Sequence, residues 1–216
     1  KNVMPWYDEA IHTPLFVWDP RSRVAGERRA ALVQTIDIAP TLLDAFGHAP
    51  TPHMQGQPLA ATIASDTPVR DAGLFGVFGL HVSVTDGRHV YMRGPSDPEA
   101  PLREYTLMPT RMRGFKPLEE LARAELHPGF SFTKGAKVLR MPGAPQRGPD
   151  DLSTLLFDLE SDPGQEQPLN DSELEARMAE LLVRQMRASE APPEQYQRLG
   201  LPETGPVGVQ HLHLNQ

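Results

Sequence analysis

Proline and glycine divide this sequence into short segments. The 216 residues include 23 prolines and 17 glycines, and both residue types interrupt regular secondary structure. A bundle of long helices is therefore excluded. The pattern favours a mixed fold, α/β with α+β character, in which short helices and strands are joined by long connections.

The overall composition is that of a folded protein. Hydrophobic residues make up 39% of the chain, which is enough to bury a core. The formal net charge of −7 argues against a nucleic-acid binder, whose surface is usually basic. There is no cysteine, so disulfides, thiolate metal sites and a nucleophile made from cysteine are excluded. No apolar run is long enough for a membrane span.

The first third of the chain predicts one buried strand and one helix. Pro14 to Trp18 is a continuous apolar run, typical of a strand that is buried on both faces. Asp37 is placed to cap a helix that accepts Pro40 in its first turn and ends at Gly47. The residues expected to face the core from this helix are Leu42, Leu43 and Phe46.

An alternating pattern from Leu74 to Arg93 predicts antiparallel strands, joined by a type I′ turn at Asp86 and Gly87. Leu155 to Leu159 supplies a further strand. A helix over Glu173 to Ala188, capped by Asp171 or Ser172, should cover this sheet. Its apolar face consists of Leu174, Met178, Leu181, Leu182 and Met186.

The segment between these strands, 94–151, is long and locally basic. It predicts a helix in "KPLEELARAEL" and a hairpin in "FSFTKGAKVLRM". Either this basic segment binds an anionic group, or it forms a solvated surface with alternating charges. Within 103–147 its cations are Arg103, Arg111, Arg113, Lys116, Arg123, Lys134, Lys137, Arg140 and Arg147, against the anions Glu104, Glu119, Glu120 and Glu125.

Four stretches, in this order, resemble the C-terminal part of a sulfatase of the alkaline phosphatase superfamily. They correspond to the family's lysine-led loop and strand, its "DI-x-PT-LL" helix, its "DGRYK"-like hairpin and its final "YDL-x-x-DP-x-E-x-x-N-L" strand and turn. The stretches are "KNVMPWYDEAIHTPLFV", "VQTIDIAPTLLDAFG", "VTDGRHVYMRG" and "LFDLESDPGQEQPLND".

The resemblance implies the C-terminal portion of an alkaline-phosphatase-like fold. Residues 1–70 would be the end of the large catalytic α/β domain, 71–190 an antiparallel-sheet subdomain with the insertion at 94–151, and 191–216 an extended tail. The catalytic nucleophile, a formylglycine, and the ligands of a divalent metal ion (Ca, Mg or Mn) would lie upstream of Lys1. This chain alone would then be inactive and would itself hold no metal.

The resemblance implies that two residues of this chain lie at the substrate. Lys1 matches the lysine that contacts the sulfate ester, where a fixed ammonium would stabilise charge on the peripheral oxygens. His12 matches a position that anchors the loop or contacts substrate. Tyr7, Asp8 and Glu9 would pack this loop, and the carboxylate of Asp162 would serve a turn. His211 and His213 are expected to be solvated rather than to bind metal.

Three functions are compatible with these patterns. The first is a sulfuric ester hydrolase that acts on a small-molecule sulfate ester, with the insertion roofing its pocket and with the missing N-terminal catalytic region or a second copy as partner. The second is a phosphonate or phosphate ester hydrolase of the same superfamily. The third is a non-catalytic, anion-binding module. An isolated "PLFV" strand beside exposed apolar surface would favour a fragment over an independent module.

Overall fold

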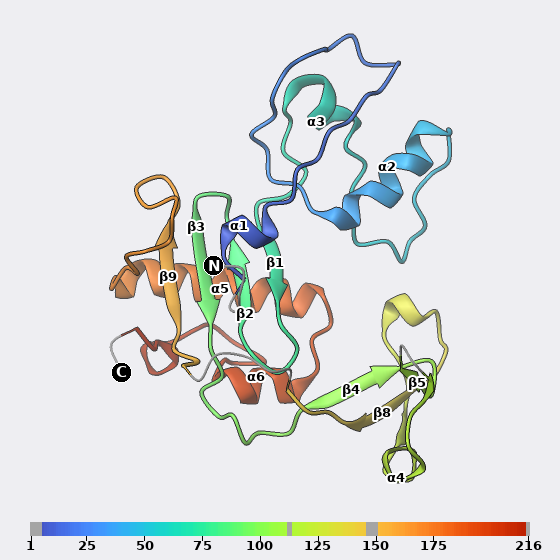
Figure 1. The fold of residues 1–216 in the computed structure, drawn as a ribbon, viewed down its shortest axis with the longest axis vertical. Coiled ribbons are helices and arrows are strands. Elements are labelled where there is room, and N and C mark those ends of the chain that lie inside the picture. The colour runs from blue at the N-terminus through green and yellow to red at the C-terminus, as the bar shows by residue number, and fades with distance from the viewer. Residues whose placement is uncertain (1–5, 112–113, 146–150, 215–216) are drawn as a thin grey trace.

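The computed structural model describes residues 6–111, 114–145 and 151–214, and combines short helices with small antiparallel sheets (Figure 1). The predicted mixed fold class is therefore confirmed. The helices are α1 (Asp8–Ile11), α2 (Ile38–Ala45), α3 (Ala60–Ser65), α4 (Leu118–Leu121), α5 (Ser172–Ala188) and α6 (Pro193–Leu199). The strands are β1 (Gly73–Gly76), β2 (Val82–Thr85), β3 (His89–Arg93), β4 (Arg103–Thr106), β5 (Thr110–Arg111), β6 (Gly114–Phe115), β7 (Glu125–His127), β8 (Val138–Pro142) and β9 (Leu155–Asp158).

The main sheet has the strand order β1-β2-β3-β9, and every neighbouring pair is antiparallel. Its register aligns Val84, Tyr91 and Leu156 across three strands. All three side chains are fully buried on the face that packs against α5. The predicted sheet, including the strand near Leu155, is confirmed.

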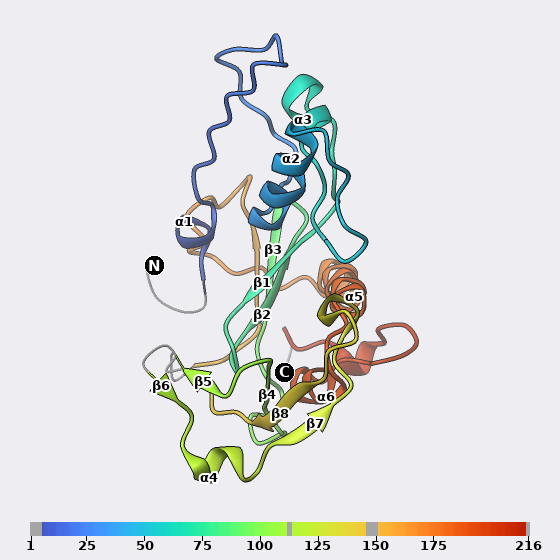
Figure 2. The ribbon, with the colours of Figure 1, turned by 90° about the vertical axis from the view of Figure 1, so that its right-hand side faces the viewer.

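Helix α5 forms as its sequence predicts. The Asp171 carboxylate accepts hydrogen bonds from the backbone N–H groups of Glu173 and Leu174, at 3.0 and 2.9 Å, which satisfies two of the unpaired donors in the first turn. The apolar face of α5 packs against one face of the main sheet, and α6 lies beside α5 (Figure 2). The buried residues of α5 in this core are Met178, Ala179, Leu182, Val183 and Met186.

The turn between β2 and β3 differs by one residue from the prediction. Thr85 pairs with Val90, and the Asp86 N–H donates to the carbonyl oxygen of His89 at 3.3 Å, so Gly87 and Arg88 are the central residues. Gly87 has a φ of +95°, as the first central position of a type II′ turn requires. Asp86 instead accepts the N–H groups of the two residues after Gly87.

The insertion was predicted incorrectly in detail. The expected helix is limited to the single turn α4, because the residues that follow form β7 and pair with β8. The expected hairpin within "FSFTKGAKVLRM" is also wrong, because β8 pairs with β4 and β7, while Ser131–Thr133 forms a 3₁₀ turn. Positive φ angles at Lys134 and Gly135 turn the chain tightly after it.

The expected extended tail instead begins with α6, whose residues Tyr196 and Leu199 enter the core. Pro193 lies in its first turn, and Gly200 ends it at a φ of +61°. Both positions suit these residue types. Within the described residues, no helix is long and apolar enough to cross a membrane.

The helix after Asp37 forms as α2, but it faces differently from the prediction. Gly47, with a φ of +75°, ends it as predicted. Asp37 does not cap it through its side chain. Its carboxylate is buried, pairs with Arg70 and accepts the N–H groups of Gln34 and Gln57, both at 2.8 Å. Leu42 and Phe46, expected in the core, are exposed.

Candidate functional site

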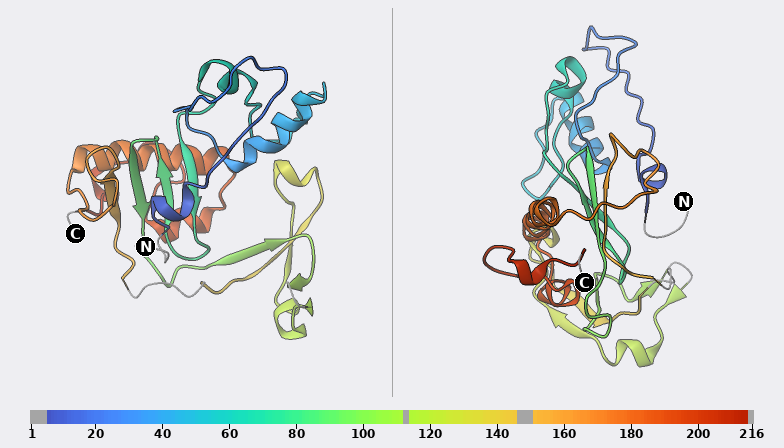
Figure 3. Two further views of the ribbon diagram at one scale, coloured as in Figure 1. Left: turned by 45° about the horizontal axis from the view of Figure 1, so that its top comes forward. Right: turned by 90° about the vertical axis from the view of Figure 1, so that its left-hand side faces the viewer.

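The candidate site is the Tyr7–His12 segment, which lies on the face of the main sheet opposite α5 (Figure 3). Tyr7 packs onto a second apolar cluster formed by Val90, Met92 and Phe157. Its ring centroid lies 6.1 Å from that of Phe157, with the two rings tilted by 60°. Apolar packing therefore fixes the start of this segment on the sheet.

Asp8 is the centre of the polar contacts in this segment. Its backbone N–H donates to Oε1 of Gln165, at 2.6 Å, across 157 residues of sequence. Its carboxylate lies 3.2 Å from Nδ1 of His12. The His12 side chain is 79% exposed, so its ring is held at one edge and open to solvent elsewhere. This geometry is compatible with both roles considered for His12.

The other residues singled out from the sequence have different outcomes. Lys1 falls outside the described residues, as do Arg113 and Arg147 of the insertion. The Asp162 carboxylate accepts the N–H groups of Glu166 and Gln167, at 2.8 and 2.9 Å. Its predicted use as a turn residue is confirmed.

The histidines near the C-terminal end are engaged in the fold rather than solvated. His213 lies partly buried with Nε2 at 3.0 Å from Nη2 of Arg93, and its backbone N–H donates to Glu175 at 2.7 Å. Burial and the Arg93 guanidinium lower the pKa of His213. His211 accepts the Gly208 N–H at Nδ1. Across residues 6–111, 114–145 and 151–214, no group of three or more His, Asp or Glu side chains could hold a metal ion.

The basic insertion is partly neutralised. Arg111 pairs with Glu120, Lys116 with Glu104 and Arg140 with Glu125. These pairs match the alternative of alternating charges. The exposed cations in the described part of the insertion are Arg111, which is paired with Glu120, and Arg123, Lys134 and Lys137.

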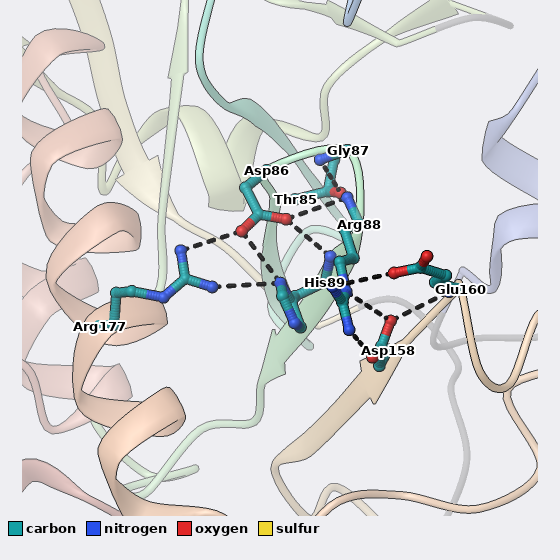
Figure 4. A network of polar contacts seen from close by, with 8 residues as sticks. All are labelled: Thr85, Asp86, Gly87, Arg88, His89, Asp158, Glu160 and Arg177. Atoms are coloured by element: carbon teal, nitrogen blue, oxygen red, sulfur yellow. Dashed lines mark hydrogen bonds and ion pairs between the residues drawn. The ribbon is translucent and has the colours of Figure 1, made fainter. Parts of the chain in front are cut away.

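A network of polar contacts joins the β2–β3 turn to helix α5 and to strand β9 (Figure 4). Asp86 contacts Arg177 of α5 at 3.0 Å and the His89 ring at 3.1 Å. Arg88 binds Asp158 of β9 through two hydrogen bonds, at 3.0 and 2.7 Å, and holds the pKa of that carboxyl well below its usual range. Every charge has a partner within the network, so the arrangement supports the turn rather than a ligand.

Two groups of exposed apolar side chains are here together called the apolar flank: Leu15–Trp18, and Ile38, Leu42 and Phe46 on α2 and its C-cap. Phe16, Trp18 and Phe46 are 91%, 86% and 79% exposed. The predicted strand at Pro14–Trp18 is not formed here, and the segment has no regular secondary structure. Arg21 donates to the Asp44 carbonyl at 3.2 Å and so ties the two parts together.

Residues 1–83 match the family model described as N-sulphoglucosamine sulphohydrolase, C-terminal. The match includes the Tyr7–His12 segment, the apolar flank and strand β1. No curated protein matches the chain.

Proposed function

On the premise that residues 1–83 resemble the C-terminal region of a sulphohydrolase, which is a sulfatase, we propose that this chain is the C-terminal part of a sulfatase-family hydrolase. Its substrate is a small-molecule sulfate ester. An upstream catalytic region supplies the nucleophile, a formylglycine, and holds the divalent metal ion, Ca, Mg or Mn. This chain contributes Lys1, His12 and part of the wall of the pocket.

The observation that carries the proposal is the apolar flank. All four residues of Leu15–Trp18 are exposed, whereas a strand with this composition belongs inside a sheet that is covered on both faces. Ile38, Leu42 and the C-cap residue Phe46 are spaced at i, i+4 and i+8 along α2 and its end, so they form one stripe that can cover such a sheet. An apolar surface of this kind marks a protein contact.

We therefore assign the apolar flank to the contact with the upstream region. The Leu15–Trp18 segment would add a strand to the sheet of that region, and α2 would pack over one face. The family model is named for a C-terminal region, which supports an upstream partner of the same polypeptide. On this basis, the 216-residue chain alone would not turn over substrate.

Lys1 and His12 are the residues proposed to meet the substrate. A sulfuryl group in transfer keeps negative charge on its peripheral oxygens, and the Lys1 ammonium would stabilise that charge without moving a proton. The exposed edge of His12 would donate a hydrogen bond to the ester, while Asp8 holds the other side of the ring. The resemblance assigns the ligands of the metal ion to the upstream region.

The experiment that tests this proposal uses the full-length protein. We expect turnover of an aryl sulfate, weaker turnover of an aryl phosphonate monoester, and no turnover by the 216-residue chain alone. Faster cleavage of the phosphonate would favour the phosphorus-ester alternative. Turnover of neither ester would leave the non-catalytic, anion-binding module as the better description.

The contact itself has a separate test. Phe46→Asp in the full-length protein should lower Tm and expose the junction to protease, because it places a charge in a buried apolar contact. Leu126→Asp is the matched control, since Leu126 is also exposed but lies on β7 in the insertion. Equal effects of the two substitutions would contradict the assignment of the apolar flank.

A further inference from the structure

The turn that follows β9 contains Gln165, which combines a left-handed backbone conformation with a buried side chain. Gln165 has a φ of +49°, a left-handed conformation that is unfavourable for a residue with a side chain. Its side chain is nonetheless 97% buried, with a relative exposure of 3%. A glycine would relieve the backbone cost, so the side chain itself is needed at this position.

The turn is built to hold Gln165 in this conformation. The Gln165 N–H donates to the Asp162 carbonyl at 3.0 Å. The Asp162 carboxylate binds the next two N–H groups, those of Glu166 and Gln167. Asp162 therefore fixes the backbone on both sides of Gln165, and the side chain points inward as a result.

The target of Gln165 is the Tyr7–His12 segment. Its Oε1 accepts the Asp8 N–H at 2.6 Å, and this N–H lies in the first turn of α1, where no partner within the helix exists. The Asp8 carboxylate in turn contacts His12. A continuous set of contacts thus runs from the β9 turn through Gln165 and Asp8 to the His12 ring.

The side-chain amide of Gln165 gives a second indication that this residue has a role beyond packing. Its Nε2 is buried and has no hydrogen-bond partner among the described residues. An unpaired buried donor is destabilising, so packing alone does not account for a glutamine here. Leucine or methionine would fill the same space without that cost. The acceptor function toward Asp8 is what the glutamine supplies.

From these contacts we infer that Gln165 is a positioning residue for the proposed ester-binding site. It fixes the first turn of α1, and through Asp8 it sets the orientation of His12. The inference rests on the proposed function for its catalytic consequence, but not for the contact itself. Gln165 does not touch the substrate and is not a catalytic residue.

Two measurements on the full-length protein test this inference. Gln165→Leu keeps the volume and removes the acceptor, so amide hydrogen exchange in the Tyr7–His12 peptide should accelerate at least tenfold. The KM for an aryl sulfate should rise about tenfold with little change in kcat, because binding through His12 weakens. Gln165→Glu retains an acceptor oxygen and should restore both values. Gln167→Leu is the control, since Gln167 is exposed in the same turn.

The outcomes separate the inference from the proposed function. Unchanged exchange in Gln165→Leu would overturn the contact, and accelerated exchange with an unchanged KM would overturn the positioning role. If Gln165→Leu unfolds, the folded Gln165→Glu variant decides the question. Wild-type amide exchange in its Tyr7–His12 peptide would support the inference, and faster exchange would contradict it. A wild-type protein without ester hydrolysis refutes the proposed function, and then the positioning role fails with it.

Discussion

Arg93 and Glu175 form an ion pair inside the core, with 3.8 Å between Nη1 and Oε1 and no exposed side-chain surface on either residue. Tyr91 lies between them, donating to Glu175 and accepting from Arg93, both at 3.0 Å. Arg93 also donates to the carbonyl oxygens of Leu199 and His211, at 2.8 and 2.7 Å. These contacts join β3, α5 and the chain after α6.

Replacing one member of this pair should be strongly destabilising. Glu175→Gln keeps the shape but leaves the Arg93 charge without a counter-ion, and removal of one partner of a buried pair costs about 3–5 kcal/mol. The free energy of unfolding, measured in urea, should fall by that amount. Glu173→Gln on the exposed side of the same helix should change it by less than about 1 kcal/mol. A loss below about 1 kcal/mol in Glu175→Gln would contradict the role of the pair.

His81 should make stability depend on pH. It is buried in the fold, with Nε2 at 3.0 Å from the Ser153 carbonyl, and burial lowers its pKa below the value of the unfolded chain. The unfolded state then binds more protons, so stability is highest above about pH 6.5 and falls as the pH drops from there toward the folded pKa. His213, whose pKa is also lowered, acts in the same direction.

The measurement for His81 is Tm between pH 8 and pH 5. His81→Gln should show a smaller decrease over this range than the wild type, because one of the two histidines with a lowered pKa is gone. His48→Gln is the control, since His48 is exposed. Identical pH profiles for wild type and His81→Gln would show that His81 does not titrate as described.

The sequence predicts elements well where one local signal is sufficient. Helix α5 follows from its Asp171 cap and its apolar period, and the main sheet follows from alternation and the glycine of its turn. Helix α6 was missed, although Pro193 in its first turn and Gly200 after its end are start and stop signals.

The candidate site is less predictable, because its contacts are long-range. His12 is found by its position in the resemblance, but the Gln165 contact to Asp8 spans 157 residues and no local pattern encodes it. Pro14–Trp18 was expected to be a strand from its composition. Strand formation needs a neighbouring strand to pair with, and the structure gives this segment none among its described residues.

Gly94 should not tolerate a side chain. A methyl group at Gly94 would overlap the carbonyl oxygen of Leu152, which is backbone and cannot rotate away. Gly94→Ala should therefore destabilise the junction between β3 and the insertion by about 1–3 kcal/mol, the usual cost of overpacking. Gly73→Ala is the control, since its methyl group would lie 3.5 Å from its nearest neighbours. A Tm for Gly94→Ala equal to that of Gly73→Ala would show that the backbone adjusts freely.

Lys1 provides the most direct test of the proposed chemistry. If its ammonium stabilises charge on the peripheral oxygens of the ester, Lys1→Ala in the full-length protein should lower kcat/KM by about 10² to 10³, or roughly 3–4 kcal/mol. Lys1→Arg should restore only part of the rate, because a planar guanidinium does not occupy the place of a compact ammonium. The assay is aryl sulfate hydrolysis, with Tm as the folding control, and we expect Tm to stay unchanged. Near wild-type kcat/KM in Lys1→Ala would show that the family's lysine does not correspond to this residue.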